Sequence, residues 1–434
     1  MINKKHIVYL DYAATTPVDP RVLKTMLPFF SEKFGNTMSL YGLGQEAKQA
    51  LEESRETISD LIKAKPEEII FTGSATESNN LALKGIALAR RSFSEGGFAN
   101  KNKGGHIIIS QIEHPCVMES AKWLEKQGVD ELRSSSPFAN ARVFEITRLK
   151  VDKYGQVNPD DVKKAIRKNT ILVSIIHASN EIGTIQPILE IGKICRQKGV
   201  YFHTDAAQSF GKIPINVNKM NIDLLTASSH KMCGPKGAAL LFVREGIRIE
   251  PLLHGGGQEM GLRSSTTNVP AIVGFAKAAK ICQKEIHPVK SAKGGAKQFN
   301  GVKKESQRLI KLRDKLIKGV LEKIDNSHLN GHPEKRLPNN ANFWFKFVEG
   351  ESIVIQLDLS GISASTGSAC SSAKLEPSHV LTAIGLKPQE AHGSLRLTLG
   401  RWTKEKDIDY VLKVLPRVIK NLRKISPFKN KTYA

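Results

Sequence analysis

The chain lacks the long apolar segments and targeting signals that would place it in a membrane or outside the cell. None of its 434 residues lies in a run that approaches the roughly 20 apolar residues of a membrane-spanning helix. The N-terminal segment 1–10 has neither the apolar core of a secretory signal nor the arginine-rich pattern of a transit peptide. We therefore expect a cytoplasmic protein that does not enter a membrane.

Cysteine is scarce, and its spacing excludes two further kinds of protein. No two of the five cysteines form a Cys-x-x-Cys pair, and all of them are scattered through the sequence: Cys116, Cys195, Cys233, Cys282 and Cys370. This spacing argues against a disulfide framework and against an intrinsic zinc site. It fits a protein of a reducing compartment.

Acidic residues are few in comparison with basic ones. The chain has 65 lysine and arginine residues against 42 aspartate and glutamate residues, and its net charge is +23. Such a charge suits either a solvated lysine-rich surface or an acidic partner. We favour the surface, and expect no direct contact with nucleic acid, because no nucleic-acid-binding motif accompanies the charge. Part of the excess recurs at helical spacing and predicts one exposed helix face: Lys413, Arg417, Lys420, Arg423 and Lys424.

The chain does have a repeated pattern of short apolar strand, loop and amphipathic helix. Two helices come first: Asp19 and Pro20 are typical of a helix start, and an apolar stripe follows from Ala47 to Ile62. Strands that alternate with helices then indicate an α/β protein with a large, mainly parallel sheet. We predict strands at 68–72, 106–110, 171–177, 200–205, 223–228 and 238–243, and helices near 79–89, 116–127 and 188–198.

After residue 263 the pattern changes to longer helices and a strand pair near 342–347 and 394–398. We interpret this part as a smaller α+β domain. The predicted division is a large domain of residues 16–262 and a small domain of residues 1–15 with 263–434. Segments rich in glycine, serine, asparagine or lysine, without hydrophobic period, predict surface insertions at 90–105, 132–142 and 287–303.

Lys231 and Asp205 each follow or end a predicted strand. Lys231, in Ser-Ser-His-Lys-Met-Cys-Gly-Pro-Lys-Gly, is either an ordinary solvated lysine or an amine that condenses with an aldehyde cofactor. Asp205, in His-Thr-Asp-Ala-Ala-Gln, could cap a helix or pair with the protonated ring nitrogen of pyridoxal phosphate. Gln208 could reach the phenolic oxygen of the same cofactor.

Two segments could bind the phosphate of such a cofactor. Residues 73–77, Gly-Ser-Ala-Thr-Glu, join a strand to a helix. Free N–H groups there and the Thr76 hydroxyl would form an anion cradle, although such turns are common before helices. Ser228 and His230 place a hydroxyl and an imidazole beside Lys231.

Three further residues have both a structural and a functional interpretation. His114, in Ile-Glu-His-Pro, is either a loop histidine or an aromatic lid that moves protons near neutral pH. Arg396 lies in a strand-like segment, where most arginines are structural, but it could also pair bidentately with the carboxylate of an amino-acid substrate. Asn180 could support the same carboxylate.

Cys370 differs from the other cysteines in its surroundings. It lies in Ser-Thr-Gly-Ser-Ala-Cys-Ser-Ser, whereas structural cysteines usually have apolar neighbours. A thiol on a flexible polar loop can react and can reach more than one site. Of the other four, only Cys233 next to the lysine is a candidate for reactivity. Lys231, Asp205 and Cys370 together predict a pyridoxal-phosphate enzyme that transfers a group to a cysteine.

Taken together, these motifs resemble those of the cysteine desulfurases, pyridoxal-phosphate-dependent transferases of class V with the aspartate-aminotransferase fold type I. The resemblance covers nearly the whole chain. Ser-Ala-Cys-Ser-Ser (368–372) followed by Leu-Glu-Pro-Ser (375–378) resembles the long-loop housekeeping and nitrogen-fixation type. Met260 stands where the family usually has an arginine, near the suspected dimer contact. Other shared motifs are Tyr-Leu-Asp-Tyr-Ala-Ala-Thr-Thr-Pro (9–17), Asn-Glu-Ile-Gly (180–183) and His-Gly-Gly-Gly-Gln-Glu (254–259).

The resemblance implies how a cofactor would be held. Lys231 would bind it covalently, Asp205 would pair with its ring nitrogen, and Gln208 would contact its phenolic oxygen. His114 would stack on the ring. The phosphate would be bound by Ala75, Thr76, Ser228 and His230, and by Thr266 from the partner subunit of a homodimer.

The resemblance also implies a reaction. Asn36, Asn180 and Arg396 would bind the substrate L-cysteine. Cys370 would receive its sulfur as a persulfide, leaving L-alanine, and would pass the sulfur to an iron–sulfur scaffold or a tRNA-thiolation protein. No intrinsic metal is implied, although Cys370 could serve as a transient iron–sulfur ligand.

Two other classes of function stay open at this point. Another class V reaction, transamination or selenocysteine lysis, would use the same cofactor, but transamination needs no loop thiol. A basic scaffold or RNA-binding protein on an inactive enzyme fold would have no physical reason to retain Lys231, Asp205 and Cys370 together.

Overall fold

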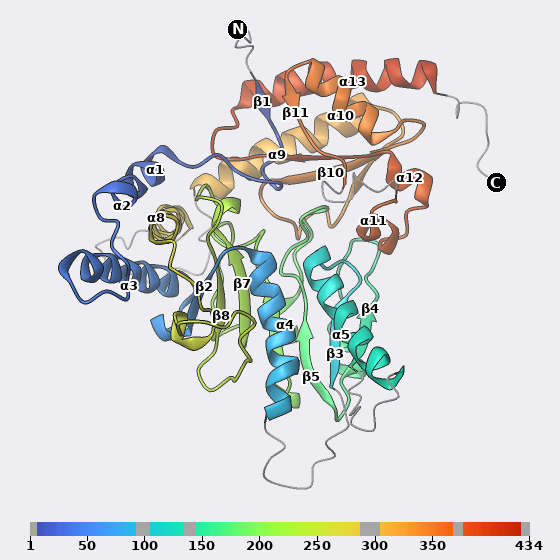
Figure 1. The fold of residues 1–434 in the computed structure, drawn as a ribbon. Helices are drawn as coiled ribbons and strands as arrows, with labels where there is room; N and C mark the ends of the chain where they lie inside the picture. Colours follow the sequence, from blue (N-terminus) through green and yellow to red (C-terminus); the bar gives the residue numbers. More distant parts are fainter. Residues whose placement is uncertain (1–6, 93–104, 134–143, 287–303, 368–375, 427–434) are drawn as a thin grey trace, which may run out of the picture.

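A computed structural model describes residues 7–92, 105–133, 144–286, 304–367 and 376–426 (Figure 1). Cys370 and most of the three predicted insertions lie outside these ranges. At two edges the prediction of loops was wrong, because helix α4 (Ala75–Ser92) and helix α5 (Pro115–Arg133) continue into the segments predicted to be inserted. Within the described part of the chain, none of the helices has the length and apolar character needed to span a bilayer.

A seven-stranded sheet is the centre of the larger part of the molecule (Figure 1). Its strands from β4 to β7 run parallel, whereas β8 is antiparallel to both neighbours, β7 and β2. The predicted α/β class with a mainly parallel sheet is confirmed. In spatial order the strands are β2 (Ile69–Thr72), β8 (Ala239–Val243), β7 (Leu224–Ser228), β6 (Tyr201–Asp205), β5 (Thr170–Ser174), β3 (His106–Ser110) and β4 (Glu145–Leu149).

The central strands are buried along their whole length, as in β3, β5, β7 and β8. Helices on both faces of a parallel sheet bury its strands in this way, so that the strand sequences read as continuous apolar runs. The predicted stripe of α3 also faces the core, since Leu51, Ile58 and Leu61 are all buried. The helices of this part are α1 (Pro20–Met26), α2 (Pro28–Ser31), α3 (Gly42–Ile62), α4, α5, α6 (Pro159–Ala165), α7 (Ile188–Lys198) and α8 (Val269–Ile286), with 3₁₀ turns η1 (Pro66–Glu68), η3 (Ser229–Lys231) and η4 (Glu259–Gly261).

The predicted start of the first helix is confirmed at Asp19. Its side chain accepts a hydrogen bond from the Arg21 N–H at 2.9 Å, and Pro20 occupies the first helical position. The same carboxylate lies 3.5 Å from Arg401 Nε, near the C-terminal end of the chain. The helix cap thus also holds two distant segments together.

A smaller part is built on a three-stranded antiparallel sheet, in the order β12-β10-β9, and a short parallel pair, β1 with β11. Val8 and Leu10 pack into the apolar cluster of this part, which favours the predicted grouping of residues 1–15 with the C-terminal segment. Its elements are β1 (Val8–Tyr9), α9 (Lys304–Lys323), β9 (Ser327–Asn330), β10 (Asn340–Phe345), α10 (Gly350–Leu359), β11 (Ile362–Ser363), α11 (His379–Ala383), α12 (Pro388–His392), β12 (Ser394–Thr398) and α13 (Glu405–Ile425).

Helix α8 changes where the division between the two parts is best placed. It packs against α1 and α3, and its Phe275 and Ala279 belong to the apolar cluster of the large sheet. A boundary after α8 therefore fits the packing better than the predicted one at residue 263. The sequence pattern changes at residue 263 because the helices become longer, and the length of a helix does not show which elements it packs against.

The predicted basic face near the C-terminus lies on α13. Lys413, Arg417, Lys420 and Lys424 are exposed. Arg423 is the exception: it is half-buried, and its Nε donates to the Lys346 carbonyl at 3.1 Å. Their exposure is compatible with both interpretations of the net charge, a solvated surface and an acidic partner.

Candidate active site

Most of the predicted cofactor-binding residues gather at one edge of the large sheet. β6 ends at Asp205, β7 ends at Ser228 and leads directly into His230 and Lys231 of η3, and the segment after β3 carries His114. β2 runs in the same direction as β7, so that the start of α4 lies at this edge as well. The carboxyl ends of parallel strands are where α/β proteins bind their ligands.

Lys231 is held by the N-terminal segment of the chain. Its Nζ donates to the carbonyls of Ala13 and Ala14, each at 2.7 Å. The same segment runs along η3, because the Thr16 N–H donates to the His230 carbonyl at 3.0 Å. Sequence reasoning assigned no role to Ala-Ala-Thr-Thr (13–16), since the two carbonyls that hold Lys231 belong to alanines and leave no side-chain signal.

Asp205 is a buried carboxylate whose two oxygens are both occupied. Oδ2 accepts from Asn79 Nδ2 at 2.7 Å, and Oδ1 accepts from the Ala207 N–H at 2.9 Å. Both donors are neutral, and a buried charge is costly without a compensating one. A protonated pyridine nitrogen would compensate it, so that this residue fits pyridoxal phosphate. Asn79, on the second turn of α4, was not recognised from the sequence.

Two hydrogen bonds fix the side chain of Gln208. Its Nε2 donates to the Ala13 carbonyl at 2.9 Å, and its Oε1 accepts from Lys212 Nζ at 3.3 Å. Lys212 is a further residue that sequence reasoning missed. Burial, and next the charge of Lys231, lower the pKa of Lys212 to about 8. A second lysine therefore lies close enough to Lys231 for the two charges to affect each other.

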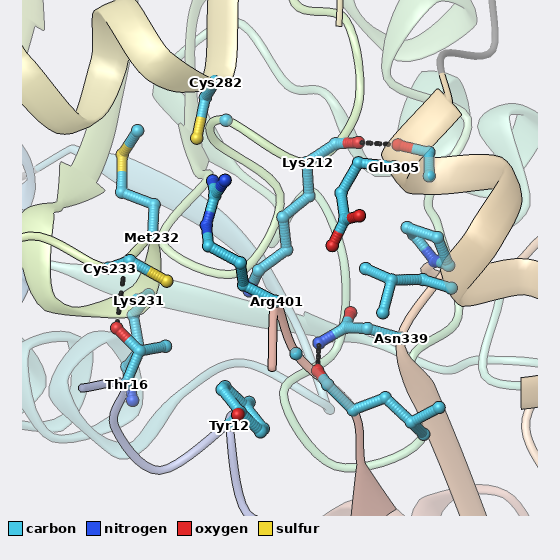
Figure 2. Close-up of a pocket in the computed structure, with 16 residues that line it drawn as sticks. Tyr12, Thr16, Lys212, Lys231, Met232, Cys233, Cys282, Glu305, Asn339 and Arg401 are labelled. Carbon is cyan, nitrogen blue, oxygen red and sulfur yellow. Dashed lines mark hydrogen bonds between the residues drawn. The ribbon is translucent and has the colours of Figure 1, made fainter. Parts of the chain in front are cut away.

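A cavity of about 70 Å³ lies beside the two lysines (Figure 2). Figure 2 shows Tyr12, Lys212, Cys233 and Arg401 around it, so that the N-terminal segment, the large sheet and the end of β12 all contribute. Cys233, the one candidate for reactivity besides Cys370, is buried there, and its N–H donates to Thr16 Oγ1 at 2.8 Å. Burial raises the pKa of the Cys233 thiol, which favours its unreactive form.

The groups predicted to bind the phosphate are either neutral or carry a partial positive charge. Burial, and next the charge of Lys231, lower the pKa of His230 to about 4, and its Nδ1 lies 3.1 Å from Thr15 Oγ1. α4 begins at Ala75 and Thr76, where the helix dipole and unsatisfied N–H groups favour an anion. Ser74, not Thr76, caps this helix, since its Oγ accepts from the Glu77 N–H at 3.1 Å. The Thr76 side chain is exposed.

His114 lies close to both Asp205 and Lys231. Burial lowers its pKa, and the charges of those two residues act on it in opposite directions. Its Nδ1 is 3.0 Å from Cys116 Sγ, and both residues line an open cavity of about 560 Å³ together with Thr76. Sequence reasoning treated Cys116 as an unreactive cysteine and did not predict that it lies at the site. Burial, and next the charge of Asp205, raise the pKa of its thiol to about 12, so that it stays protonated.

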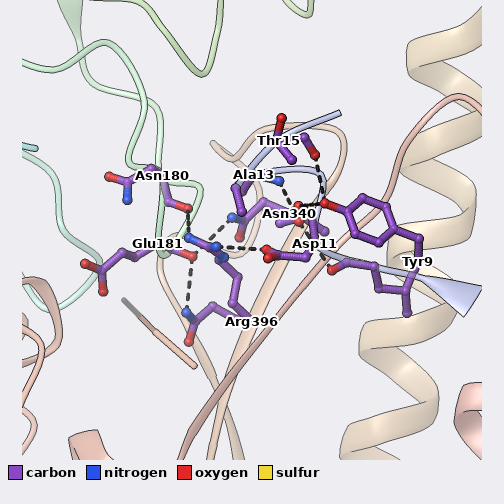
Figure 3. A network of polar contacts seen from close by, with 12 residues as sticks. Tyr9, Asp11, Ala13, Thr15, Asn180, Glu181, Asn340 and Arg396 are labelled. Carbon is purple, nitrogen blue, oxygen red and sulfur yellow. Dashed lines mark hydrogen bonds and ion pairs between the residues drawn. The ribbon is translucent and has the colours of Figure 1, made fainter. Parts of the chain in front are cut away.

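Arg396 is buried and already engaged within the chain (Figure 3). Its Nη2 lies 2.9 Å from Asp11 Oδ1, and its Nη1 donates to the Asn180 carbonyl at 3.0 Å. The structure thus brings Arg396 and Asn180 together, although through the main chain of Asn180. The Arg396 Nε has no hydrogen-bond partner among the described residues.

The two ends of the segment that carries Cys370 also lie here. Ser365 pairs with Arg396 through main-chain hydrogen bonds of 2.7 and 3.3 Å. At the other end, Ser378 Oγ donates to Glu181 Oε2 at 2.5 Å. Residues 368–375 themselves, including Cys370, lie outside the described residues.

Two predicted site residues are not brought to Lys231 by the fold of one chain. Asn36 and Thr266 are exposed. Asn36 Oδ1 accepts from the Met38 N–H at 3.0 Å, and the neighbours Thr37, Met38 and Thr267 line a different cavity beside α3. In the described part of the chain, no group of histidine, cysteine, aspartate and glutamate is arranged to hold a metal ion.

Comparison with known proteins places these observations in one family. The aminotransferase class-V family matches residues 8–411. The chain is 49% identical over 425 residues to the cysteine desulfurase IscS of Dictyoglomus turgidum, covering 98% of each, and 50% identical over 419 residues to cysteine desulfurase IscS 1 of Archaeoglobus fulgidus, covering 96% of this chain and 98% of the relative.

Solved structures agree with that similarity. A NifS-like protein superposes with a TM-score of 0.81 at 35% identity, over 96% of this chain and all of the other. The structure described as SspA in complex with cysteine superposes with a TM-score of 0.72 at 36% identity, over 90% and 98% of the two chains.

Proposed function

The chain belongs to the aminotransferase class-V family, and from this membership we propose that it is a pyridoxal-phosphate-dependent cysteine desulfurase. It would take the sulfur from L-cysteine and leave L-alanine. The observation that carries the proposal is the convergence of Lys231, Asp205 and His114 at the carboxyl edge of the sheet, in a chain similar to cysteine desulfurases over nearly its full length.

The residues at this edge would hold the cofactor. Lys231 would bind it covalently through Nζ, Asp205 would balance the charge of its ring nitrogen, and Gln208 would contact its phenolic oxygen. Ala75, Thr76, Ser228 and His230 would bind its phosphate. When bound, the cofactor supplies an electron sink for the carbon skeleton of the substrate.

The substrate would be oriented by residues of both parts of the molecule. Arg396, supported by Asn180, would bind the carboxylate of cysteine. In this structure the Arg396 guanidinium is paired with Asp11 at 2.9 Å, and its Nε has no hydrogen-bond partner among the described residues. A substrate carboxylate would either share the guanidinium with Asp11 or displace Asp11. His114 would cover the cofactor ring and take part in proton transfer.

Sulfur transfer would fall to Cys370. Its thiolate would attack the sulfur of the bound cysteine and form a sulfur–sulfur bond. The carbon–sulfur bond would break, and its electron pair would stay on carbon until a proton arrives and L-alanine forms. The position of Ser365 and Ser378 supports this role, because the segment that carries Cys370 begins beside Arg396 and ends beside Glu181, the chain neighbour of Asn180.

We further propose that the enzyme is a cytoplasmic homodimer in which Asn36 and Thr266 complete the site of the partner subunit. Their exposure on a single chain supports this assignment. The persulfide would pass to an iron–sulfur scaffold or to a tRNA-thiolation protein. A reducing compartment would keep the Cys370 thiol available for the next turnover.

The test is to quantify alanine and sulfide from L-cysteine and a reductant, for the wild-type protein and for Cys370→Ala. We expect the variant to keep the yellow colour of the bound cofactor and to lose sulfur release, and Lys231→Ala to lose the colour. Full sulfide production by Cys370→Ala would contradict the persulfide step. A wild-type protein that never binds the cofactor would contradict the whole proposal.

A further inference from the structure

A chain of four side chains connects the buried carboxylate to the imidazole that would cover the cofactor. Asn79 Nδ2 lies 2.7 Å from Asp205 Oδ2 and 3.0 Å from Cys116 Sγ. Cys116 Sγ in turn lies 3.0 Å from His114 Nδ1. Asn79 is fully buried, and Cys116 lies at the wall of the open cavity, so the connection runs from the sheet to the site surface.

The direction of the first two hydrogen bonds follows from Asp205. Its oxygens accept from Asn79 Nδ2 and from the Ala207 N–H, and an ionised carboxylate can only accept. The amide group of Asn79 carries two protons. One is given to Asp205, and the other points to Cys116 Sγ, so the sulfur is an acceptor there and its own proton is left for another partner.

The direction at His114 follows from the main chain. The Cys116 N–H donates to His114 Nδ1 at 3.3 Å, and the position of this proton is fixed by the backbone. A proton on Nδ1 would face that N–H, donor against donor. Nδ1 is therefore a lone pair that accepts from the Cys116 N–H. The Cys116 thiol lies 3.0 Å from the same atom and is placed to donate its proton there, with the Thr76 side chain as its other hydrogen-bond partner. Burial lowers the pKa of His114, which favours the neutral ring, and its single proton then lies on Nε2.

We propose that Asn79 and Cys116 are positioning residues that fix His114 in the tautomer with its proton on Nε2. One hydrogen-bonded chain would then fix two groups: the Asp205 carboxylate that pairs with the ring nitrogen of the cofactor, and the N–H that His114 presents. The inference rests on the proposed function, in which His114 covers the cofactor ring. It goes beyond that function by giving two further residues, on α4 and α5, a role in the chemistry of the site.

Three variants of the holoenzyme separate this role from simple packing. Cys116→Ala removes the S–H donor and the sulfur acceptor, whereas Cys116→Ser retains a donor and an acceptor at the same position. Cys195→Ala is the matched control, since it removes another buried thiol, on α7, away from the site. His114→Gln identifies the signal of His114 in the spectrum.

The first readout is the ¹⁵N NMR shift of the two His114 ring nitrogens, measured without substrate. We expect a lone-pair shift for Nδ1 and an N–H shift for Nε2 in the wild type, in Cys116→Ser and in Cys195→Ala. Cys116→Ala should show a mixture of tautomers. Because no turnover is needed, this result stands apart from the proposed desulfurase activity, which would fail separately if wild-type protein released no alanine.

The second readout is the pH dependence of kcat. Loss of the S–H donor removes a bond that favours the neutral ring, so Cys116→Ala should raise the pKa of His114 and move the acid limb of the profile to higher pH. Its kcat should fall about tenfold, part of the roughly 10²–10⁴-fold that a positioned proton-transfer group contributes. Cys116→Ser should restore both. These variants leave the other charged and titratable groups near the ring in place: Lys84, Glu119, Lys122, Lys126, Asp205, Lys231 and His379.

Two results would overturn the proposal. One is a wild-type protein with the His114 proton on Nδ1. The other is a Cys116→Ala variant whose tautomer and pH profile equal those of the wild type.

Discussion

The buried carboxylate Asp205 is the residue on which we expect charge balance at the site to depend. It has neutral donors on both oxygens, and a single carboxylate-to-amide change removes its charge while leaving its size. We expect Asp205→Asn to weaken retention of pyridoxal phosphate and to lower kcat by roughly 10²-fold or more, because a fixed charge aimed at a developing or bound charge is worth several kcal/mol in a buried site. Cofactor absorbance after dialysis and the rate of alanine formation measure the two effects.

Asp223 provides the matched control for that substitution. It is also a largely buried carboxylate at the sheet, but it pairs with Arg244 at 3.3 Å and accepts from the Phe202 N–H at 2.9 Å, away from the site. Asp223→Asn should lower stability and leave cofactor retention as in the wild type. Equal retention by Asp205→Asn and the wild type would contradict the assigned role of Asp205.

Glu181 makes the stability of the protein depend on pH. Burial raises the pKa of this carboxyl to about 7, above its ordinary value of 4.5. Between these values the folded protein holds a proton that the unfolded chain has lost, so this contribution is present below about pH 4.5 and declines as pH rises through 7. Between pH 5 and 8, the free energy of unfolding of Glu181→Gln should decline less than that of the wild type, by about 1–3 kcal/mol.

Urea unfolding of the wild type and of Glu181→Gln, at pH 5 and at pH 8, measures that difference. Comparing the change between the two pH values cancels the effect of the substitution on packing. Glu351, an exposed glutamate at the start of α10, is the control site, and Glu351→Gln should leave the pH dependence unchanged. Parallel pH dependences for the wild type and Glu181→Gln would show that Glu181 ionises normally in the folded protein.

Individual site residues differ in how far the sequence could reveal them. Lys231, Asp205 and Cys370 stand in motifs whose composition already indicates their chemistry. Asn79 and Lys212 do not, because their importance comes from contacts with other segments of the chain: Asn79 with Asp205, and Lys212 with Lys231. A hydrogen bond between positions 79 and 205 leaves no local pattern.

At the level of elements, helix α7 shows how packing can reverse a local preference. Gly192 lies inside this helix, where alanine is ordinarily more stable by about 1 kcal/mol. A Cβ at Gly192 would lie 1.9 Å from the Met220 carbonyl oxygen, so the backbone of the neighbouring segment occupies its space. We expect Gly192→Ala to lower the free energy of unfolding by about 1–3 kcal/mol, as other overpacking substitutions do.

Thermal or urea unfolding measures this change. Gly42 at the start of α3 is the control, because a Cβ there meets no atom within 4 Å. Gly42→Ala should be neutral or slightly stabilising. A Gly192→Ala protein as stable as the wild type would mean that the 216–222 segment moves away without cost.

The elements themselves were largely predictable, whereas their partners were not. The strands at 106–110 and 223–228 were expected, and β8 forms at 239–243 even though few of its residues are β-branched. Its antiparallel direction depends on the turn after η3, not on the apolar run. α8 was placed with the C-terminal part because of its length, but its buried face contacts α1 and α3. Periodicity reports that a face is apolar and does not report what covers it.

At the scale of the whole molecule, a group of large apolar side chains is exposed on and near the segment between α2 and α3. Leu40 is 92% exposed, and Phe34, Met38, Tyr41 and Met260 are each more than half exposed. Clustered exposure of this kind marks an interaction surface. Asn36 and Thr266 are exposed next to this group, since their chain neighbours Thr37 and Thr267 line one cavity together with Met38 and Met260.

If the chain forms the homodimer proposed above, Leu40→Asp should shift it from dimer to monomer and lower its turnover. The buried charge would oppose association, and the loss of the partner subunit would remove Thr266 from the phosphate and Asn36 from the substrate site. Light scattering after gel filtration, combined with alanine formation, measures both. Leu359→Asp is the control, because Leu359 is 71% exposed on α10 in the smaller part and should change neither property. A fully active Leu40→Asp monomer would show that each chain carries a complete site, with Asn36 and Thr266 outside it.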